Sequence, residues 1–111
     1  AGAKEVLISS NKRFALMHEY KNEEISLNSL IKKLSPVDLI LIEGWKKENI
    51  KKIEVYRKEI NKPLLTNNDK NIIAIATNDK SININNMTIL DLNNYEQIAE
   101  FIYALIQKEN K

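Results

Sequence analysis

Short apolar segments alternate with polar stretches along most of the chain, and their spacing predicts a succession of strands and helices. Residues 5–9 and 14–20 are predicted strands, and the four polar residues between them form a link short enough for an antiparallel hairpin. Ser26 is a candidate N-cap for a helix that ends before Pro36. This helix carries apolar residues at helical spacing, namely Leu27, Leu30, Ile31 and Leu34.

Two continuous apolar runs predict strands that are covered on both faces, as in a parallel sheet. The first run, residues 39–42, lies in the segment VDLILIEGW and ends at Glu43 and Gly44. The second run, residues 71–76 (NIIAIA), ends in Thr77, Asn78 and Asp79. The polar residues that follow both runs are therefore candidates for one edge of the same sheet.

Alternating and helical patterns complete the prediction. Residues 51–57 alternate Ile53 and Val55 with polar neighbours and predict a half-buried strand, and residues 87–92 predict a last strand. Asn94 is a candidate N-cap for a closing helix, with Gln97 as its capping-box partner. The apolar stripe of that helix is predicted to comprise Tyr95, Ile98, Ala99, Ile102, Leu105 and Ile106.

Together these elements predict an α/β fold with a mixed, mostly parallel sheet flanked by helices, and with an antiparallel hairpin. The length of 111 residues fits a single domain over residues 1–111. Two long helices are too few to cover both faces of such a sheet. We therefore expect the chain to form a homodimer or to receive the missing layer from a preceding segment.

Composition removes several classes of chemistry. With no Cys, the chain has no disulfide, thiolate metal site or Cys nucleophile, and its single histidine, His18, rules out a multi-histidine metal site within one chain. The net charge of +2 is too small to predict nucleic-acid binding, so we expect no nucleic-acid partner. Without a signal peptide or an apolar run of membrane length, we expect a soluble cytoplasmic protein that does not bind membranes.

The apolar strand that ends in Glu43 has the Walker B arrangement, which places a carboxylate beside the triphosphate of a nucleotide. Glu43 could there hold Mg²⁺ through water or orient an attacking water, while Gly44 lets the backbone turn away. The other interpretation, which the pattern leaves open, is that Glu43 only solvates the end of a strand.

The carboxylate of Asp79 could accept two hydrogen bonds from a guanine edge, and Thr77 or Asn78 could complete a base pocket. The alternative is an Asx-turn that closes the strand, since Asn and Asp are common in turns. In the segment 44–62, seven Lys/Arg and three Glu give a local net charge of +4. Lys52 and Arg57 within it are candidate phosphate ligands, or residues of an ordinary solvated face.

Several of these segments, in the same order, resemble the molybdopterin-guanine dinucleotide biosynthesis protein B family. The matching segments are the opening AGA, VLISS (6–10), FALMHE (14–19), VDLILIEGW (37–45), KIEVYR (52–57), IIAIATND (72–79) and ILDLNN (89–94). Each is a weak motif alone, but their common order and spacing make the resemblance specific. It extends from Ala1 almost to the C-terminus.

The resemblance implies a P-loop GTP-binding protein of the molybdenum cofactor pathway, which uses GTP and Mg²⁺ and forms dimers. It also implies that such proteins assist the guanylyltransferase that joins GMP to molybdopterin. By this resemblance Glu43 serves Mg²⁺ or water, Asn78 and Asp79 face the base, and the phosphates or the pterin contact Lys52 and Arg57.

The family's Walker A loop precedes the AGA segment, and no GxxxxGKS or GxxxxGKT sequence occurs in these residues. We therefore expect this chain to lack the N-terminal P-loop unit. The complete protein would be at most a weak GTPase, and this chain would be inactive. The alternative is a non-catalytic α/β interaction module that docks the guanylyltransferase without binding nucleotide.

Overall fold

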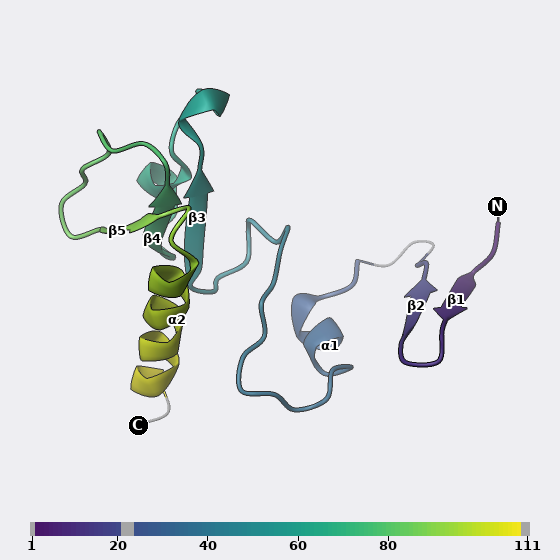
Figure 1. Cartoon of the computed structure of the whole chain (residues 1–111). Coiled ribbons are helices and arrows are strands. Elements are labelled where there is room, and N and C mark those ends of the chain that lie inside the picture. Colours follow the sequence, from purple (N-terminus) through teal and green to yellow (C-terminus); the bar gives the residue numbers. More distant parts are fainter. Residues whose placement is uncertain (1, 21–23, 110–111) are drawn as a thin grey trace. The chain divides into compact units, whose positions relative to one another are not determined.

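The computed structural model describes residues 2–20 and 24–109 of the chain (Figure 1). Its contacts divide the chain into two compact units, Ala1–Ile40 and Leu41–Lys111, which are described separately. Within them lie a three-stranded parallel sheet, an antiparallel hairpin and two α-helices, so the predicted α/β class is confirmed. The prediction of one domain over the whole chain stays a prediction.

The first unit contains the predicted hairpin. Strands β1 (Glu5–Ser9) and β2 (Phe14–His18) pair antiparallel, with Glu5 opposite His18 and Ser9 opposite Phe14. The amide N–H of Ser10 donates to the carbonyl oxygen of Arg13 at 2.8 Å and closes the link. All residues of both strands are exposed.

The N-cap predicted for the first helix is also confirmed. The hydroxyl oxygen of Ser26 accepts a hydrogen bond from the amide N–H of Ser29, 3.2 Å away, at the start of α1 (Leu27–Ile31). The helix is shorter than its apolar pattern predicts, because it ends at Ile31 and leaves Leu34 exposed. Leu27 is the buried residue of this helix.

The second unit is built on the parallel sheet, with strand order β3-β4-β5 (Figure 1). The strands are β3 (Lys52–Tyr56), β4 (Ile72–Thr77) and β5 (Thr88–Asp91). β4 is the central strand, and all its residues except the half-buried Ile73 are buried. The continuous apolar run therefore gives the doubly covered strand that it predicts.

Helix α2 (Tyr95–Glu109) contributes to the core of this unit. Ile98 and Phe101 pack against a cluster formed by Ala74, Ala76 and Leu90. Tyr95 was predicted in the apolar stripe, but it is 78% exposed, because it lies in the first turn and outside this cluster. Phe101 takes part in the packing although the predicted stripe omits it.

The start of α2 confirms only half of the predicted capping box. The amide N–H of Gln97 donates to Asn94 Oδ1 at 3.1 Å, as an N-cap requires. The side-chain oxygen of Gln97 accepts from the amide N–H of Asp91 at 2.8 Å, instead of from Asn94. The cap therefore also ties the helix to the end of β5.

On β3, Ile53 packs towards the core, while the next residue, Glu54, is buried against the segment that follows the strand. The Glu54 carboxylate accepts hydrogen bonds from the amide N–H groups of Leu65 (2.8 Å) and Thr66 (3.0 Å). These residues open the short 3₁₀-helix η2 (Leu65–Asn68), which follows a first one, η1 (Lys58–Ile60). Val55 is exposed, so the apolar residues of this strand are not both buried as predicted.

The prediction of a strand over residues 39–42 is wrong. These residues form no strand, and Leu39 and Leu41 are 41% and 76% exposed. An apolar run forms a covered strand only when neighbouring strands pair with its backbone and other elements cover its side chains. Among the described residues, no strand pairs with this segment.

Candidate functional site

The carboxyl ends of β3 and β4 bring part of the predicted site together. Tyr56 and Thr77 are paired across the two parallel strands, so Arg57 and Asn78 follow neighbouring strands at the same edge of the sheet. Thr77 is also paired with Asp91 of β5, and the amide N–H of Leu92 donates to the carbonyl oxygen of Thr77. Ligands of open α/β sheets bind at this kind of edge, so we take it as the candidate site.

Asn78 connects this end of β4 to the turn after β3. Its Oδ1 accepts a hydrogen bond from the amide N–H of Lys58 at 2.9 Å. Its Nδ2 donates to both carboxylate oxygens of Glu59, at 2.8 and 3.1 Å. The acceptor and the donor group of this amide are therefore both engaged within the chain.

Asp79 is held by its neighbours on both sides. Its amide N–H donates to the hydroxyl oxygen of Thr77 at 2.9 Å. Its Oδ1 accepts from the amide N–H of Ser81 at 3.0 Å and from the Ser81 hydroxyl at 2.6 Å. The bond from the amide N–H of Ser81 forms the Asx-turn, which the sequence left open as an alternative.

The Asp79 carboxyl group is ionised at neutral pH. Hydrogen bonds from the Ser81 side chain and backbone lower its pKa from the usual 3.8, and the charge of Lys58 lowers it further. Its second oxygen, Oδ2, accepts no hydrogen bond from a described residue. An Asx-turn and a ligand contact can therefore coexist on this side chain.

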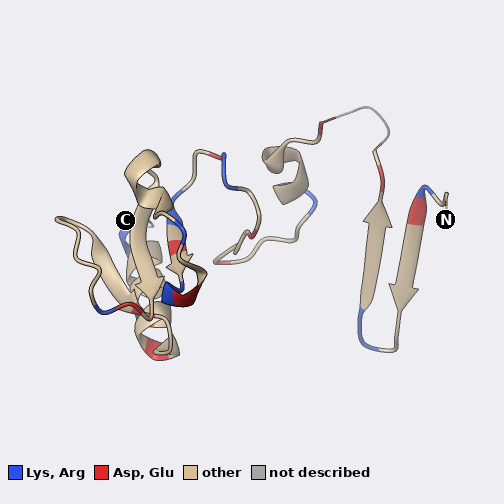
Figure 2. Cartoon of the chain, turned by 90° about the horizontal axis from the view of Figure 1, so that it is seen from above, with Lys and Arg blue, Asp and Glu red and all other residues tan. Residues whose placement is uncertain are grey.

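Arg57 is exposed at the same edge, and its side chain forms no ion pair with any residue that the structure describes. Lys58, Glu59 and Ser81 also contribute here, although no sequence pattern predicted them. Lys58 and Glu59 lie in the recognised basic segment, but only the pairing of β3 with β4 places them beside Asn78. Basic and acidic positions are interspersed over this unit (Figure 2).

Lys52 lies at the other end of β3 and is not brought together with Arg57. Its Nζ donates to Asp69 Oδ2 at 2.7 Å and to the carbonyl oxygen of Lys46 at 2.7 Å. The bond from Lys52 is the main cause that lowers the pKa of Asp69. The role of Lys52 towards phosphates stays a prediction.

Glu43 and Gly44 lie in the loop that precedes β3, and both are exposed. Gly44 has a φ of +89°, in the left-handed region that favours glycine, which agrees with its predicted role in the turn. The predicted strand before Glu43 is absent, so the structure does not form a Walker B strand end. Within residues 2–20 and 24–109, no three His, Cys, Asp or Glu side chains cluster to hold a metal ion.

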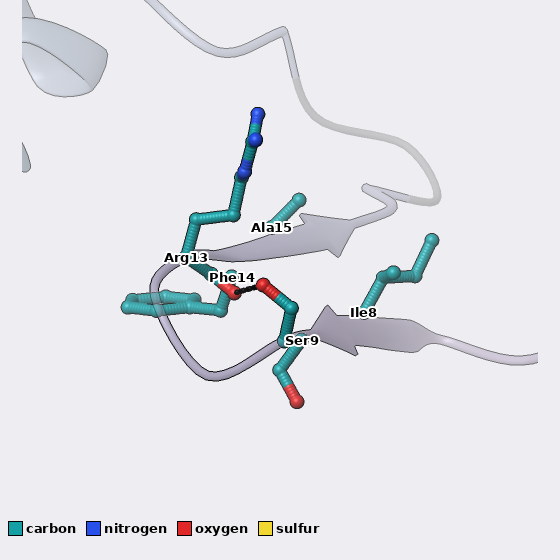
Figure 3. Close-up of a pocket in the computed structure, with 6 residues that line it drawn as sticks. Ile8, Ser9, Arg13, Phe14 and Ala15 are labelled. Atoms are coloured by element: carbon teal, nitrogen blue, oxygen red, sulfur yellow. Dashed lines mark hydrogen bonds between the residues drawn. The ribbon is translucent and has the colours of Figure 1, made fainter.

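The hairpin carries a separate shallow hollow of about 410 Å³ (Figure 3). None of the predicted site residues lines it; its lining consists of Ile8, Ser9, Ser10, Arg13, Phe14 and Ala15. His18 also lies on the hairpin, with Nδ1 3.2 Å from Glu5 Oε2 and its ring edge-to-face with Tyr20. No catalytic role was predicted for His18, and these contacts give it a place in the hairpin.

Comparison with known proteins shows the family. The model of the family MobB, "Molybdopterin guanine dinucleotide synthesis protein B", matches residues 1–78, which include the edge formed by Arg57, Thr77 and Asn78. This chain belongs to the MobB family. The resemblance seen in the sequence motifs is therefore confirmed.

Two relatives are named molybdopterin-guanine dinucleotide biosynthesis adapter protein. The one from Escherichia coli is 37% identical over 114 residues, which cover 99% of this chain and 64% of the relative. The one from Haemophilus influenzae is 38% identical over 104 residues, which cover 92% of this chain and 56% of the relative. This member of the MobB family thus spans less than two thirds of the length of either relative. None of its described helices is long and apolar enough to cross a membrane.

Proposed function

We propose that this chain is part of an adapter protein for molybdopterin guanine dinucleotide biosynthesis. In this role it binds GTP and assists the guanylyltransferase that attaches GMP to molybdopterin. The observation that carries the proposal is the 37–38% identity, over 92–99% of this chain, to two proteins that bear the adapter name. The family match supports the same pathway.

The guanine base is assigned to the carboxyl edge of β4. Asp79 is ionised, and its Oδ1 takes the two hydrogen bonds from Ser81. A carboxylate has about four acceptor positions on its two oxygens. The group therefore keeps capacity for the N1–H and 2-amino donors of guanine, while Thr77 holds its backbone.

Arg57 is the proposed phosphate or pterin ligand at this edge, because it is exposed and follows the strand next to β4. A guanidinium suits the two-pronged recognition of phosphate oxygens. The parallel order β3-β4-β5 supports a sheet of the P-loop NTPase type. In such a fold, backbone N–H groups of the P-loop hold most of the triphosphate, and we place that loop in the part of the relatives that this chain does not span.

Glu43 is the proposed Mg²⁺ carboxylate. Mg²⁺ is commonly held by one or two carboxylates together with substrate phosphates and water, so a single exposed carboxylate fits this mode of binding. The turn at Gly44 lets the backbone change direction directly after Glu43. When bound, the ion would neutralise phosphate charge.

A second candidate function is docking without a nucleotide. The word adapter in the names of both relatives favours it, since an adapter can act by protein contact alone. In that case the same edge of the sheet would contact the guanylyltransferase, and the chain would form homodimers without binding GTP.

Calorimetric titration of the full-length protein with GTP and ATP, each with and without Mg²⁺, separates the two functions. The nucleotide proposal predicts that GTP binds more tightly than ATP and that Mg²⁺ increases the GTP affinity. The substitution Glu43→Gln should remove the gain from Mg²⁺ and leave the melting temperature unchanged. If the protein binds neither GTP nor ATP, docking without a nucleotide would be favoured.

A further inference from the structure

The side chain of Asn78 forms a strap across the carboxyl edge of the sheet. It joins the end of β4 to two consecutive residues, Lys58 and Glu59, which lie 20 and 19 positions earlier in the chain. The amide oxygen meets a backbone N–H and the amide nitrogen meets a carboxylate. This pairing leaves no alternative orientation of the amide that would satisfy both partners.

The strap also supplies what the start of η1 lacks. Arg57, the residue before this short helix, makes no side-chain capping bond. The first N–H of η1, that of Lys58, is instead satisfied by Asn78 Oδ1. A cap from the residue that follows β4 fixes where the turn begins, and it thereby holds the backbone of Arg57 and Lys58 at this edge.

We infer that Asn78 is a positioning residue, which holds Arg57 and Lys58 beside Asp79 for an anionic ligand and does not itself contact that ligand. The inference rests on the proposed nucleotide site. It departs from the sequence-based expectation that Asn78 faces the base, because both of its polar groups are already bonded within the chain. The charge of Lys58 lowers the pKa of the Asp79 carboxyl group, which agrees with Lys58 and Asp79 lying at the same edge.

The test uses the full-length protein and an exchange of polarity within the strap. Asn78→Asp keeps the acceptor for Lys58 N–H but sets a second carboxylate against Glu59. Adding Glu59→Gln restores a donor–acceptor pair in the opposite sense and returns the strap to its original net charge of −1. Asn93→Asp is the matched control, because Asn93 is exposed and follows β5 at the same edge.

We expect Asn78→Asp to weaken GTP binding roughly tenfold, as loss of a paired polar contact does. The affinity for inosine triphosphate, which lacks the 2-amino group, should fall by the same factor, because Asn78 does not contact the base. The double variant should recover the affinity for both nucleotides. Asn93→Asp should leave both affinities within about twofold.

A double-mutant cycle with Arg57→Gln tests whether the strap acts through Arg57. In the Asn78→Asp background, Arg57→Gln should cost no further GTP affinity, because the guanidinium is already displaced. In the double variant Asn78→Asp, Glu59→Gln, which we call the reversed strap, Arg57→Gln should again weaken GTP binding. A merely structural asparagine would not change the effect of Arg57 in this way.

Three results would overturn the inference. The first is that Asn78→Asp and Arg57→Gln reduce GTP affinity additively. The second is that Asn78→Asp changes the ratio of GTP affinity to inosine triphosphate affinity. The third is that the Asn78→Asp, Glu59→Gln double variant melts like the wild type but does not recover its GTP affinity. If the wild-type protein binds neither nucleotide, the proposed function fails and the positioning role with it. Recovery of the melting temperature in the reversed strap would then show that Asn78 is structural only.

Discussion

Lys52 Nζ lies 2.7 Å from Asp69 Oδ2, and the same ammonium group donates to the carbonyl oxygen of Lys46 at 2.7 Å. The side chains of Lys52 and Asp69 are 17% and 23% exposed, so most of this ion pair is shielded from water. Asp69 Oδ1 accepts from the amide N–H of Asn71 on its other side. The pair therefore connects the loop before β3, β3 itself and the turn before β4.

These contacts predict a structural role for Lys52. Lys52→Met should lower the melting temperature, because it leaves Asp69 without its cation. GTP affinity of the folded protein should change by less than about twofold, since Lys52 lies at the end of β3 away from Arg57. Differential scanning calorimetry and titration with GTP measure the two effects.

The matched control is Lys51→Met, which breaks the exposed ion pair between Lys51 and Glu109. Exposed pairs contribute little, so this variant should melt close to the wild type. A large loss of GTP affinity in Lys52→Met with an unchanged melting temperature would instead identify Lys52 as a phosphate ligand.

The ion pair also predicts how stability depends on pH. The hydrogen bond from Lys52 and the bond from the Asn71 backbone lower the pKa of Asp69 in the folded chain from its usual 3.8. A lowered folded pKa contributes stability that is present above about pH 3.8 and is lost as the pH falls through the folded value. Asp69→Asn should therefore lower the melting temperature at neutral pH, and its difference from the wild type should shrink as the pH falls below about 3.8.

Melting curves between roughly pH 7 and pH 3 test this dependence. Asp38→Asn, which changes an exposed aspartate in the first unit, controls for the loss of one carboxylate. A difference between Asp69→Asn and the wild type that stays constant over this pH range would show that the charge of Asp69 adds no stability.

Glu54 is buried within β3 and is predicted to anchor the segment around η2. Its two oxygens accept from the amide N–H groups of Leu65 and Thr66. Glu54→Gln would replace one acceptor with an NH₂ donor that faces a backbone donor. Leaving such a group unsatisfied should lower the free energy of unfolding by about 1–3 kcal/mol.

Chemical denaturation measures that loss, with Glu100→Gln on the exposed part of α2 as the control. Hydrogen exchange at the amides of Leu65 and Thr66 should accelerate in Glu54→Gln. Unchanged exchange and unchanged stability would mean that Glu54 does not hold this segment in place.

Local patterns predicted those parts of the fold that depend on near neighbours. The N-caps at Ser26 and Asn94 were predictable because each bond joins residues three positions apart. The doubly buried β4 was predictable from its unbroken apolar run. In contrast, the same pattern over residues 39–42 gave no strand, since pairing partners are not encoded in the run itself.

The candidate site shows the same division. The sequence identified Arg57, Thr77, Asn78 and Asp79, and the parallel register of β3 and β4 places them at one edge. It did not identify Glu59 or Ser81 as partners, because these contacts depend on turn geometry after the strands end. The burial of Glu54 was equally hidden, since alternation alone assigns a glutamate to the solvent side.

We propose that the carboxyl edge of β3 and β4 recognises a guanine base through Asp79. Guanine offers two donors to a carboxylate, whereas xanthine replaces the 2-amino group with a carbonyl oxygen. Asp79→Asn exchanges one acceptor for an NH₂ donor, which opposes a donor of guanine and suits the carbonyl of xanthine.

Titration of the full-length Asp79→Asn variant with GTP and with xanthosine triphosphate therefore tests whether Asp79 contacts the base. We predict that GTP affinity falls about tenfold to a hundredfold, as for loss of 1–3 kcal/mol, while xanthosine triphosphate weakens less or binds more tightly. Equal losses for both nucleotides would contradict the claim and leave Asp79 only the Asx-turn that it forms with Ser81.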